Sequence, residues 1–301
     1  MKEIPKRIFI GFLIYSSISL LVSVISFELF RRMEATEKLN SHINTLFNKT
    51  VHAIKLGQDF MLYEIYQDVF FRTGHSVALD KYEDLLKDVD AIQIDISKIK
   101  NIQRGALYAE ITYLDNLMKS YDSIFKIIVQ KETLRGFKDY GMSGKMKSNI
   151  QELEAQSEID VVNVLLMRKY EKDYIIQGDT SSITELRSMS EKVDKGLINN
   201  NLLSNTEKKH LREALSNYVS AFLQIVSLEV EIGHHRQVGL SVEMKEILVK
   251  VDITVDKINE LAIKQKEEIN ATIKVVFLTI ITVSVLLILL MAIAFRYMTS
   301  F

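Results

Sequence analysis

A short charged segment near the middle of the chain carries the side chains best suited to bind a small molecule. The stretch LLMRKYEKDYIIQGD, residues 165–179, places Arg168 and Lys172 four residues apart, on one face of a helix. Like charges at this spacing repel by a few tenths of a kcal/mol unless an acid lies beside them. Because an arginine can hold a carboxylate through two hydrogen bonds, the segment predicts a binding site for a small anion, formed by Arg168, Tyr170 and Lys172.

The same charges also have a purely structural explanation. An acidic side chain on a facing helix, or Glu171 and Asp173 on the same helix, would neutralise Arg168 and Lys172 without any ligand. The sequence alone leaves both interpretations open.

The other polar residues show no pattern of catalysis or metal binding. His234 and His235 are adjacent, so on a helix they would point about 100° apart, which suits a solvated face better than a shared metal ion. The chain has no cysteine, and its 38 basic and 39 acidic residues are interspersed without a basic stripe. We therefore expect no enzyme, metal site, cofactor or nucleic-acid partner.

The elements that position these side chains should be almost entirely helical. One proline and 11 glycines in 301 residues leave few signals for strands or tight turns. Apolar residues instead recur at helical spacing through 31–72, 79–99, 107–134, 145–177, 181–198 and 205–274. Gly136, Gly141 and Gly144 mark the clearest break, and Ser204 with Glu207 has the spacing of a capping box.

Two apolar runs near the ends of the chain predict transmembrane helices. Residues 8–30 contain one charged residue, Glu28, and residues 275–295 contain none; each run is long enough to cross a hydrocarbon layer of about 30 Å. Glu28 should lie near the outer end of its span, where Arg31 and Arg32 could pair with it. A cleaved signal peptide is the alternative for the first run, but its apolar part is long and no small-residue cleavage site follows it.

Two spans divide the chain into five parts. We expect a cytoplasmic N-terminus (1–7), a first span (8–30), an extracytoplasmic domain (31–274), a second span (275–295) and the start of a cytoplasmic region (296–301). Positive charges flank both ends of both spans, so they do not decide the orientation; a short leader before a long domain favours placing that domain outside.

An internal similarity suggests a duplicated helical hairpin. The stretch YQDVFFRTG (66–74) aligns with EKDYIIQGD (171–179), and the match continues into the next helix, with Tyr82 over Leu186 and Val89 over Val193. Chance alignment of two amphipathic helices is the alternative. Tyr63 aligns with Arg168, which argues against an anion site in the first copy.

The stretches GFKDYGMSGKMKSNIQELE (136–154) and VNVLLMRKYEKDYIIQGD (162–179) resemble the helical bimodular sensor domain. This domain is the extracytoplasmic part of many bacterial chemoreceptors and sensor histidine kinases. The resemblance implies an all-α fold in which six helices form an elongated bundle of two stacked four-helix modules, with a transmembrane helix at each end. Family members bind small organic or inorganic anions, or dock a periplasmic binding protein.

These observations favour the sensory and membrane part of a bacterial receptor, embedded in the inner membrane with a periplasmic central domain. We expect a homodimer, because bundle receptors signal across a two-fold pair, and contacts with membrane lipid. The chain ends six residues after the second span, so we expect a fragment of a longer receptor with an output region beyond Phe301. The alternative function is a membrane-anchored structural stalk or protein-docking module without a small-molecule ligand.

Overall fold

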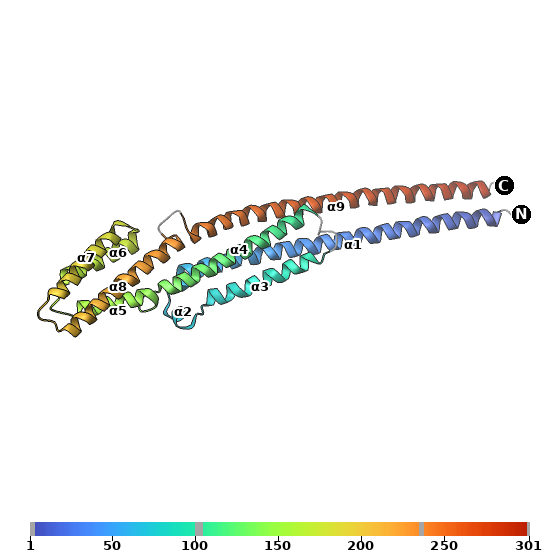
Figure 1. Ribbon diagram of the computed structural model, residues 1–301. Coiled ribbons are helices and arrows are strands. Elements are labelled where there is room, and N and C mark those ends of the chain that lie inside the picture. The colour runs from blue at the N-terminus through green and yellow to red at the C-terminus, as the bar shows by residue number, and fades with distance from the viewer. Residues whose placement is uncertain (1–3, 100–104, 235–237, 300–301) are drawn as a thin grey trace. The chain divides into compact units, whose positions relative to one another are not determined.

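The computed structural model confirms the predicted all-α class (Figure 1). It describes residues 4–99, 105–234 and 238–299, and every regular element in these ranges is helical. The α-helices are α1 (Ile4–Asp59), α2 (Asp68–Thr73), α3 (Val77–Ser97), α4 (Ala106–Arg135), α5 (Gly141–Glu154), α6 (Val161–Gln177), α7 (Ser181–Asn199), α8 (Asn205–Ile232) and α9 (Leu240–Thr299).

The helices belong to two compact units. Unit 1 contains residues 1–49, 88–114 and 253–301, and unit 2 contains residues 50–87 and 115–252. The helices α1, α3, α4 and α9 each contribute one part to unit 1 and another to unit 2.

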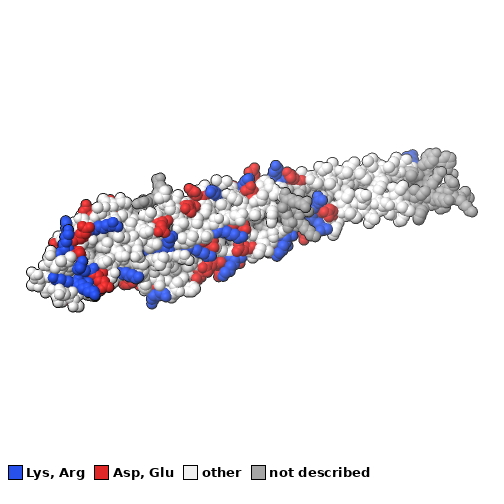
Figure 2. Space-filling model, viewed as in Figure 1, with Lys and Arg blue, Asp and Glu red and all other residues white. Residues whose placement is uncertain are grey.

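Unit 1 contains both apolar runs, and each run is part of a long unbroken helix. The two helices are long and apolar enough to cross a membrane. In the most apolar 18 residues of each helix, no residue is buried by the rest of the chain. On the face shown in Figure 2 these segments are almost free of charged side chains. Leu29 and Phe30 of α1 line a small apolar cavity together with Val276 and Phe277 of α9, so the two apolar segments lie against each other.

The predicted pairing at the end of the first apolar run is present. Glu28 lies 3.9 Å from Arg31 and 3.4 Å from Arg32, measured between carboxylate oxygen and guanidinium nitrogen. Beyond this point the helices of unit 1 bury apolar side chains against one another, including Leu39, Ile43, Leu46, Ile96, Ile111, Leu114, Ile258 and Ala262.

The end of α1 differs from the single helix expected over residues 31–72. A π-helical turn, Phe60–Glu64, follows α1, and the backbone N–H of Ile65 donates to the carbonyl of Phe60, 2.9 Å away. Phe60 and Ile65 are both fully buried, and the wider turn lets residues five apart face the same core. The chain then breaks at Gln67 before the short α2, so the interruption begins earlier than the predicted one at residues 72–76.

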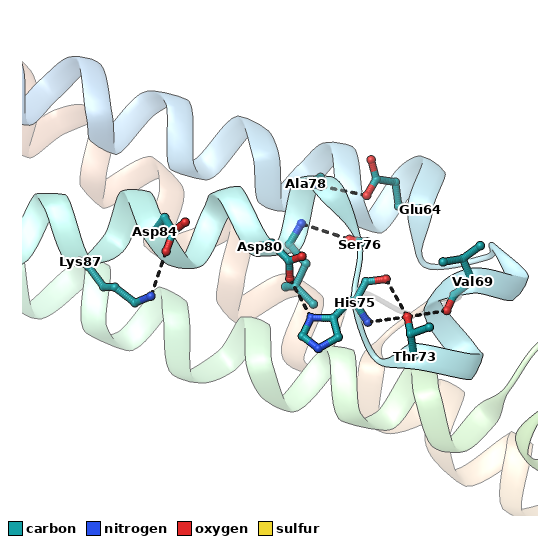
Figure 3. Close-up of polar contacts among 10 residues, drawn as sticks. Glu64, Val69, Thr73, His75, Ser76, Ala78, Asp80, Asp84 and Lys87 are labelled. Atoms are coloured by element: carbon teal, nitrogen blue, oxygen red, sulfur yellow. Dashed lines mark hydrogen bonds and ion pairs between the residues drawn. The ribbon is translucent and has the colours of Figure 1, made fainter.

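The start of α3 is tied to the π-helical turn (Figure 3). Glu64 accepts the backbone N–H of Ala78 at 2.9 Å, and Ser76 accepts that of Leu79 at 3.1 Å. These contacts satisfy two of the N–H groups that have no partner within the helix. Glu64 therefore adds a contact from 14 residues earlier in the chain to the local cap formed by Ser76.

In unit 2, α5, α6, α7 and α8 pack around one apolar core. Its members come from all four helices and include Ile150, Leu153, Val164, Met167, Leu186, Val193, Leu211, Tyr218 and Phe222. The predicted capping box is present at the start of α8, where Ser204 and Glu207 each accept the other's backbone N–H.

The prediction of one continuous helix is wrong for two parts of the chain. Residues 145–177 are divided between α5 and α6 by a turn at 155–160, in which the Asp160 side chain accepts the N–H of Val162 at 3.1 Å. Residues 205–274 are divided between α8 and α9, because Gly233 takes a left-handed conformation (φ 89°) and ends α8. His234 therefore follows a helix end instead of lying on a continuous solvated face, and His235 lies outside the described residues.

The two similar segments have similar local structure. Gly74 ends α2 at φ 73° and Gly178 ends α6 at φ 70°, and each donates its N–H to the carbonyl four residues earlier. In the helices that follow, the aligned pairs Tyr82/Leu186 and Val89/Val193 are all buried. These agreements favour the predicted duplication.

Candidate functional site

The predicted anion-binding residues lie on α6, which has well-defined ends. Asp160 caps its first turn and Gly178 closes its last. Val164, Met167 and Tyr174 are its buried residues, while Leu166 and Tyr170 are only partly buried at the edge of the core. The predicted stripe of Leu166, Tyr170 and Tyr174 is thus in contact with the core. The most buried face of α6, however, runs through Met167 and not through Leu166 or Tyr170.

Arg168 is paired within the chain. Its Nη1 atom lies 3.1 Å from Oε1 and 3.2 Å from Oε2 of Glu154, the last residue of α5. The two side chains are 31% and 27% exposed, so the pair is shielded on most sides but open to solvent. The acidic partner on a facing helix, one of the two explanations open from the sequence, is therefore present.

The three candidate residues do not converge on one point. Successive residues of a helix are about 100° apart, so Tyr170 lies roughly 200° around the helix from Arg168, while Lys172 lies on nearly the same side as Arg168. Tyr170 instead packs beside Lys169, whose Nζ is 5.5 Å from the ring centroid. Lys172 is exposed. Arg168 and Lys172 can face the same anion, whereas Tyr170 faces another part of the bundle.

A second polar pair, Glu171 with Tyr218, lies next to Arg168. The Tyr218 hydroxyl on α8 donates to Oε2 of Glu171 at 2.8 Å, and Tyr218 is fully buried. Burial raises the pKa of Glu171, although the hydrogen bond from Tyr218 and the charges of Arg168 and Lys172 oppose this rise. Burial and the nearby Glu171 carboxylate raise the pKa of Tyr218 as well.

This arrangement defines what the site can do chemically. The guanidinium of Arg168 interacts with two carboxylates, that of Glu154 by direct contact and that of Glu171 through space. Glu154 contacts only the Nη1 atom of Arg168, so an incoming anion could either displace Glu154 or use the remaining N–H groups of the guanidinium. The arrangement thus holds a carboxylate at Arg168 within the bundle and leaves the guanidinium partly open to solvent.

Sequence reasoning found Arg168, Lys172 and the neighbouring Glu171 but missed Glu154 and Tyr218. Glu171 is three residues from Arg168, so helical spacing alone places it nearby. Tyr218 is 47 residues from Glu171, and no local pattern links them. Glu154 lies across a turn that the sequence did not predict.

A groove between α7 and α8 is a second feature of this bundle. It has a volume of about 640 Å³. Its lining combines serine and charged side chains with the apolar side chains of Leu215, Val219 and Leu223. Arg212 donates two hydrogen bonds to Asp194, of 2.6 and 3.2 Å, at one side of the groove. Across the described residues no group of three His, Asp or Glu side chains is placed to hold a metal ion.

Comparison of the chain with models of known protein families, with curated proteins and with solved structures finds no match.

Proposed function

We propose that this chain is the sensory and membrane part of a bacterial transmembrane receptor of the chemoreceptor or sensor-kinase type. One observation carries the proposal: α1 and α9 each run without a break from an exposed apolar segment into a packed helical core of the same unit. In α1 the apolar segment leads to the buried Ile43 and Leu46, and in α9 it follows the buried Ile258 and Ala262. Such a continuous helix can transmit a small axial or rotational displacement.

The proposed location is the bacterial inner membrane, with spans at 8–30 and 275–295 and residues 31–274 in the periplasm. The support for two spans is that neither helix has a buried residue in its most apolar window, and exposing so much apolar surface would cost free energy in water. The ion pairs of Glu28 with Arg31 and Arg32 suit the outer end of the first span, where charged side chains reach the interface.

The proposed signal is a small organic or inorganic anion, or a periplasmic binding protein. It would act on a homodimer in which each chain forms two stacked four-helix modules. The bundle of α5 to α8 would be one module, and Arg168 with Lys172 would receive the anion. Binding would separate Glu154 on α5 from Arg168 on α6. This exchange offers a physical route from ligand binding to a change in helix packing.

A structural stalk or a protein-docking module is the second candidate function. The observation that favours it is the same ion pair, since Arg168 already has an acidic partner without any ligand. A bundle of this kind could hold a partner protein at a distance from the membrane and bind no small molecule.

The proposal is tested first by topology. Protease added to intact spheroplasts should digest residues 31–274 and leave the short ends protected, and lysis should not be needed. Digestion that occurs only after lysis would contradict the periplasmic location.

Ligand binding is tested by calorimetry on the full chain in lipid nanodiscs. Acetate, succinate, nitrate and glutamate are suitable probes, because each offers anionic oxygens to a guanidinium. Saturable binding of one of them, or of a purified periplasmic binding protein, supports the sensor, whereas binding of none of these supports the structural stalk or the docking of another protein.

A further inference from the structure

Helix α6 is apolar on two opposite sides. One side is buried in the core of the bundle, through Val164, Met167 and Tyr174. On the other side Val162, Leu165 and Ile176 are 66%, 54% and 71% exposed. At about 100° per residue, these three side chains point away from the core. Apolar side chains exposed opposite the core face are typical of a surface that another element covers.

The exposed side forms a continuous seam, which we call the outer stripe of α6: Val162, Leu165, Lys169, Lys172 and Ile176. Successive members are three or four residues apart, as in the seam of a coiled coil. Both lysines are exposed, and Lys169 lies over the ring of Tyr170. The outer stripe thus has apolar side chains at its two ends and cations at its centre.

The turn beside the start of α6 adds a further exposed apolar side chain. Asn200 Nδ2 donates to the carbonyl of Glu158 at 2.7 Å, which joins the turn after α7 to the turn before α6. The backbone N–H of Leu202 donates to the Asn200 side chain at 2.8 Å, and Leu202 is 81% exposed. An exposed leucine in an ordered turn extends the apolar surface beyond α6.

The outer stripe carries a net positive charge. Arg168 is paired with Glu154 and lies about 80° to one side of the stripe, so it is not part of this surface. Asp173, four residues after Lys169, is half-buried beside the stripe and can offset one lysine charge. Lys172, which is also a candidate for anion binding, lies at the edge nearest Arg168. One positive charge therefore remains for a partner to neutralise.

A second copy of the chain is a poor occupant of the outer stripe. In a two-fold pair the same surface of each copy meets the other. Lys169 and Lys172 at the centre would then face lysines across the axis, and opposed like charges disfavour association. A helix with acidic residues at the centre of its own apolar seam matches both the apolar ends and the cationic centre of the stripe.

We propose that the outer stripe of α6 is a docking surface for an acidic amphipathic helix of another protein. The partner helix places apolar side chains against the two ends of the stripe and carboxylates against Lys169 and Lys172. Because Arg168 lies to one side of the stripe, this docking surface goes beyond the proposed anion site. It does not require that the chain bind an anion.

A pair of synthetic helical peptides tests the docking surface. Each peptide has leucines along one heptad seam, and the two central seam positions are glutamate in the acidic peptide and lysine in the basic peptide. This pattern is the same in both chain directions, so it fits either orientation of a partner helix. Fluorescence anisotropy measures binding of each labelled peptide to the full chain in nanodiscs, with empty nanodiscs as the background. The wild type should bind the acidic peptide at least about 10-fold more tightly than the basic one.

Two variants separate the apolar and the electrostatic parts of the surface. Leu165→Asp should weaken binding of the acidic peptide by about 10- to 150-fold, the loss that corresponds to one buried leucine. Lys169→Glu should remove the preference for the acidic peptide. Leu134→Asp is the matched control, because Leu134 lies on α4 and is 56% exposed, and it should leave peptide binding unchanged.

Circular dichroism should show wild-type helicity for all three variants, since each replaced side chain is exposed. The proposal is overturned if the wild type binds neither peptide or binds both equally, or if Leu165→Asp binds the acidic peptide as tightly as the wild type. Sedimentation of the chain in detergent covers the other occupant. A wild-type dimer that Leu165→Asp dissociates would assign the outer stripe to a contact between copies and would also overturn the proposal.

Discussion

Arg168 on α6 presents a single guanidinium nitrogen to both carboxylate oxygens of Glu154 on α5, at 3.1 and 3.2 Å. In a forked arginine–carboxylate pair two nitrogens share the contact, which is the stronger arrangement. The observed geometry joins the helices and still leaves the pair accessible to solvent. Two different experiments separate the structural role of this pair from a role in binding.

The first prediction concerns stability without ligand. Arg168→Ala should lower the free energy of unfolding by about 1 to 3 kcal/mol, because the partly buried Glu154 loses its charged partner. Glu154→Gln should cost less, and the double variant should show a coupling energy of about 0.5 kcal/mol or more. Denaturant unfolding of the full chain in detergent measures all three. Strictly additive effects would show that the pair contributes nothing to folding.

The second prediction concerns anion binding and applies to whichever probe binds in calorimetry. Loss of a charge-assisted hydrogen bond worth about 1.5 to 3 kcal/mol should make Arg168→Ala bind about 10- to 150-fold more weakly. Glu154→Gln should bind the same anion more tightly, because the internal competitor for Arg168 has lost its charge. An Arg168→Ala variant with wild-type affinity would exclude this site.

The third prediction follows from the pKa of Glu171, which burial raises above its ordinary value. The folded chain holds this proton more tightly than the unfolded chain, so the contribution of Glu171 to stability is present at acidic pH and lost as the pH rises through its folded pKa. Glu171→Gln can still accept the Tyr218 hydrogen bond and carries no charge.

Melting curves of this variant at several pH values check the sign. Relative to the wild type, Glu171→Gln should gain stability from about pH 4 to pH 7. Tyr218→Phe should steepen the wild-type dependence, since it removes the hydrogen bond that opposes the rise in pKa. A stability difference between Glu171→Gln and the wild type that is constant with pH would contradict the assignment.

The fourth prediction ranks three glycine substitutions by their surroundings. Gly136→Ala combines a positive φ of 79° with a Cβ position 2.0 Å from the carbonyl oxygen of Tyr140, so it should be the most destabilising. Gly74→Ala has φ 73° but open space, and should cost only the left-handed strain of about 1 to 2 kcal/mol. Gly196→Ala lies in α7 with open space and should stabilise by about 0.5 to 1 kcal/mol. Thermal unfolding that gives any other order of stability would contradict the backbone conformation and the space around these three glycines.

Local information was sufficient for several features of this protein. The scarcity of proline and glycine predicted the all-helical class. The two apolar runs predicted two helices long and apolar enough to cross a membrane, and these are parts of α1 and α9. The capping box at Ser204 and Glu207 and the break at Gly136 were also predicted correctly, because each depends on residues within one or two turns of one another.

Other features depend on contacts between distant parts of the chain. The π-helical turn places Phe60 and Ile65 in one core, and the break at 155–160 contains neither proline nor glycine. Gly233 and Gly239 were visible in the sequence, but a helical pattern on both sides concealed the corner between α8 and α9.

The polar contacts show most clearly what only the tertiary structure decided. Charged residues at helical spacing indicate which side chains share a face, but not which helix lies opposite. Arg135 and Glu229 are 94 residues apart, and Glu132 and His234 are 102 apart. The sequence determined that the chain would be helical and where the two long apolar segments would lie, because backbone hydrogen bonding and apolar length act locally. Packing alone decided that the two glutamates would be buried together, since burial depends on neighbours that the chain brings from far away.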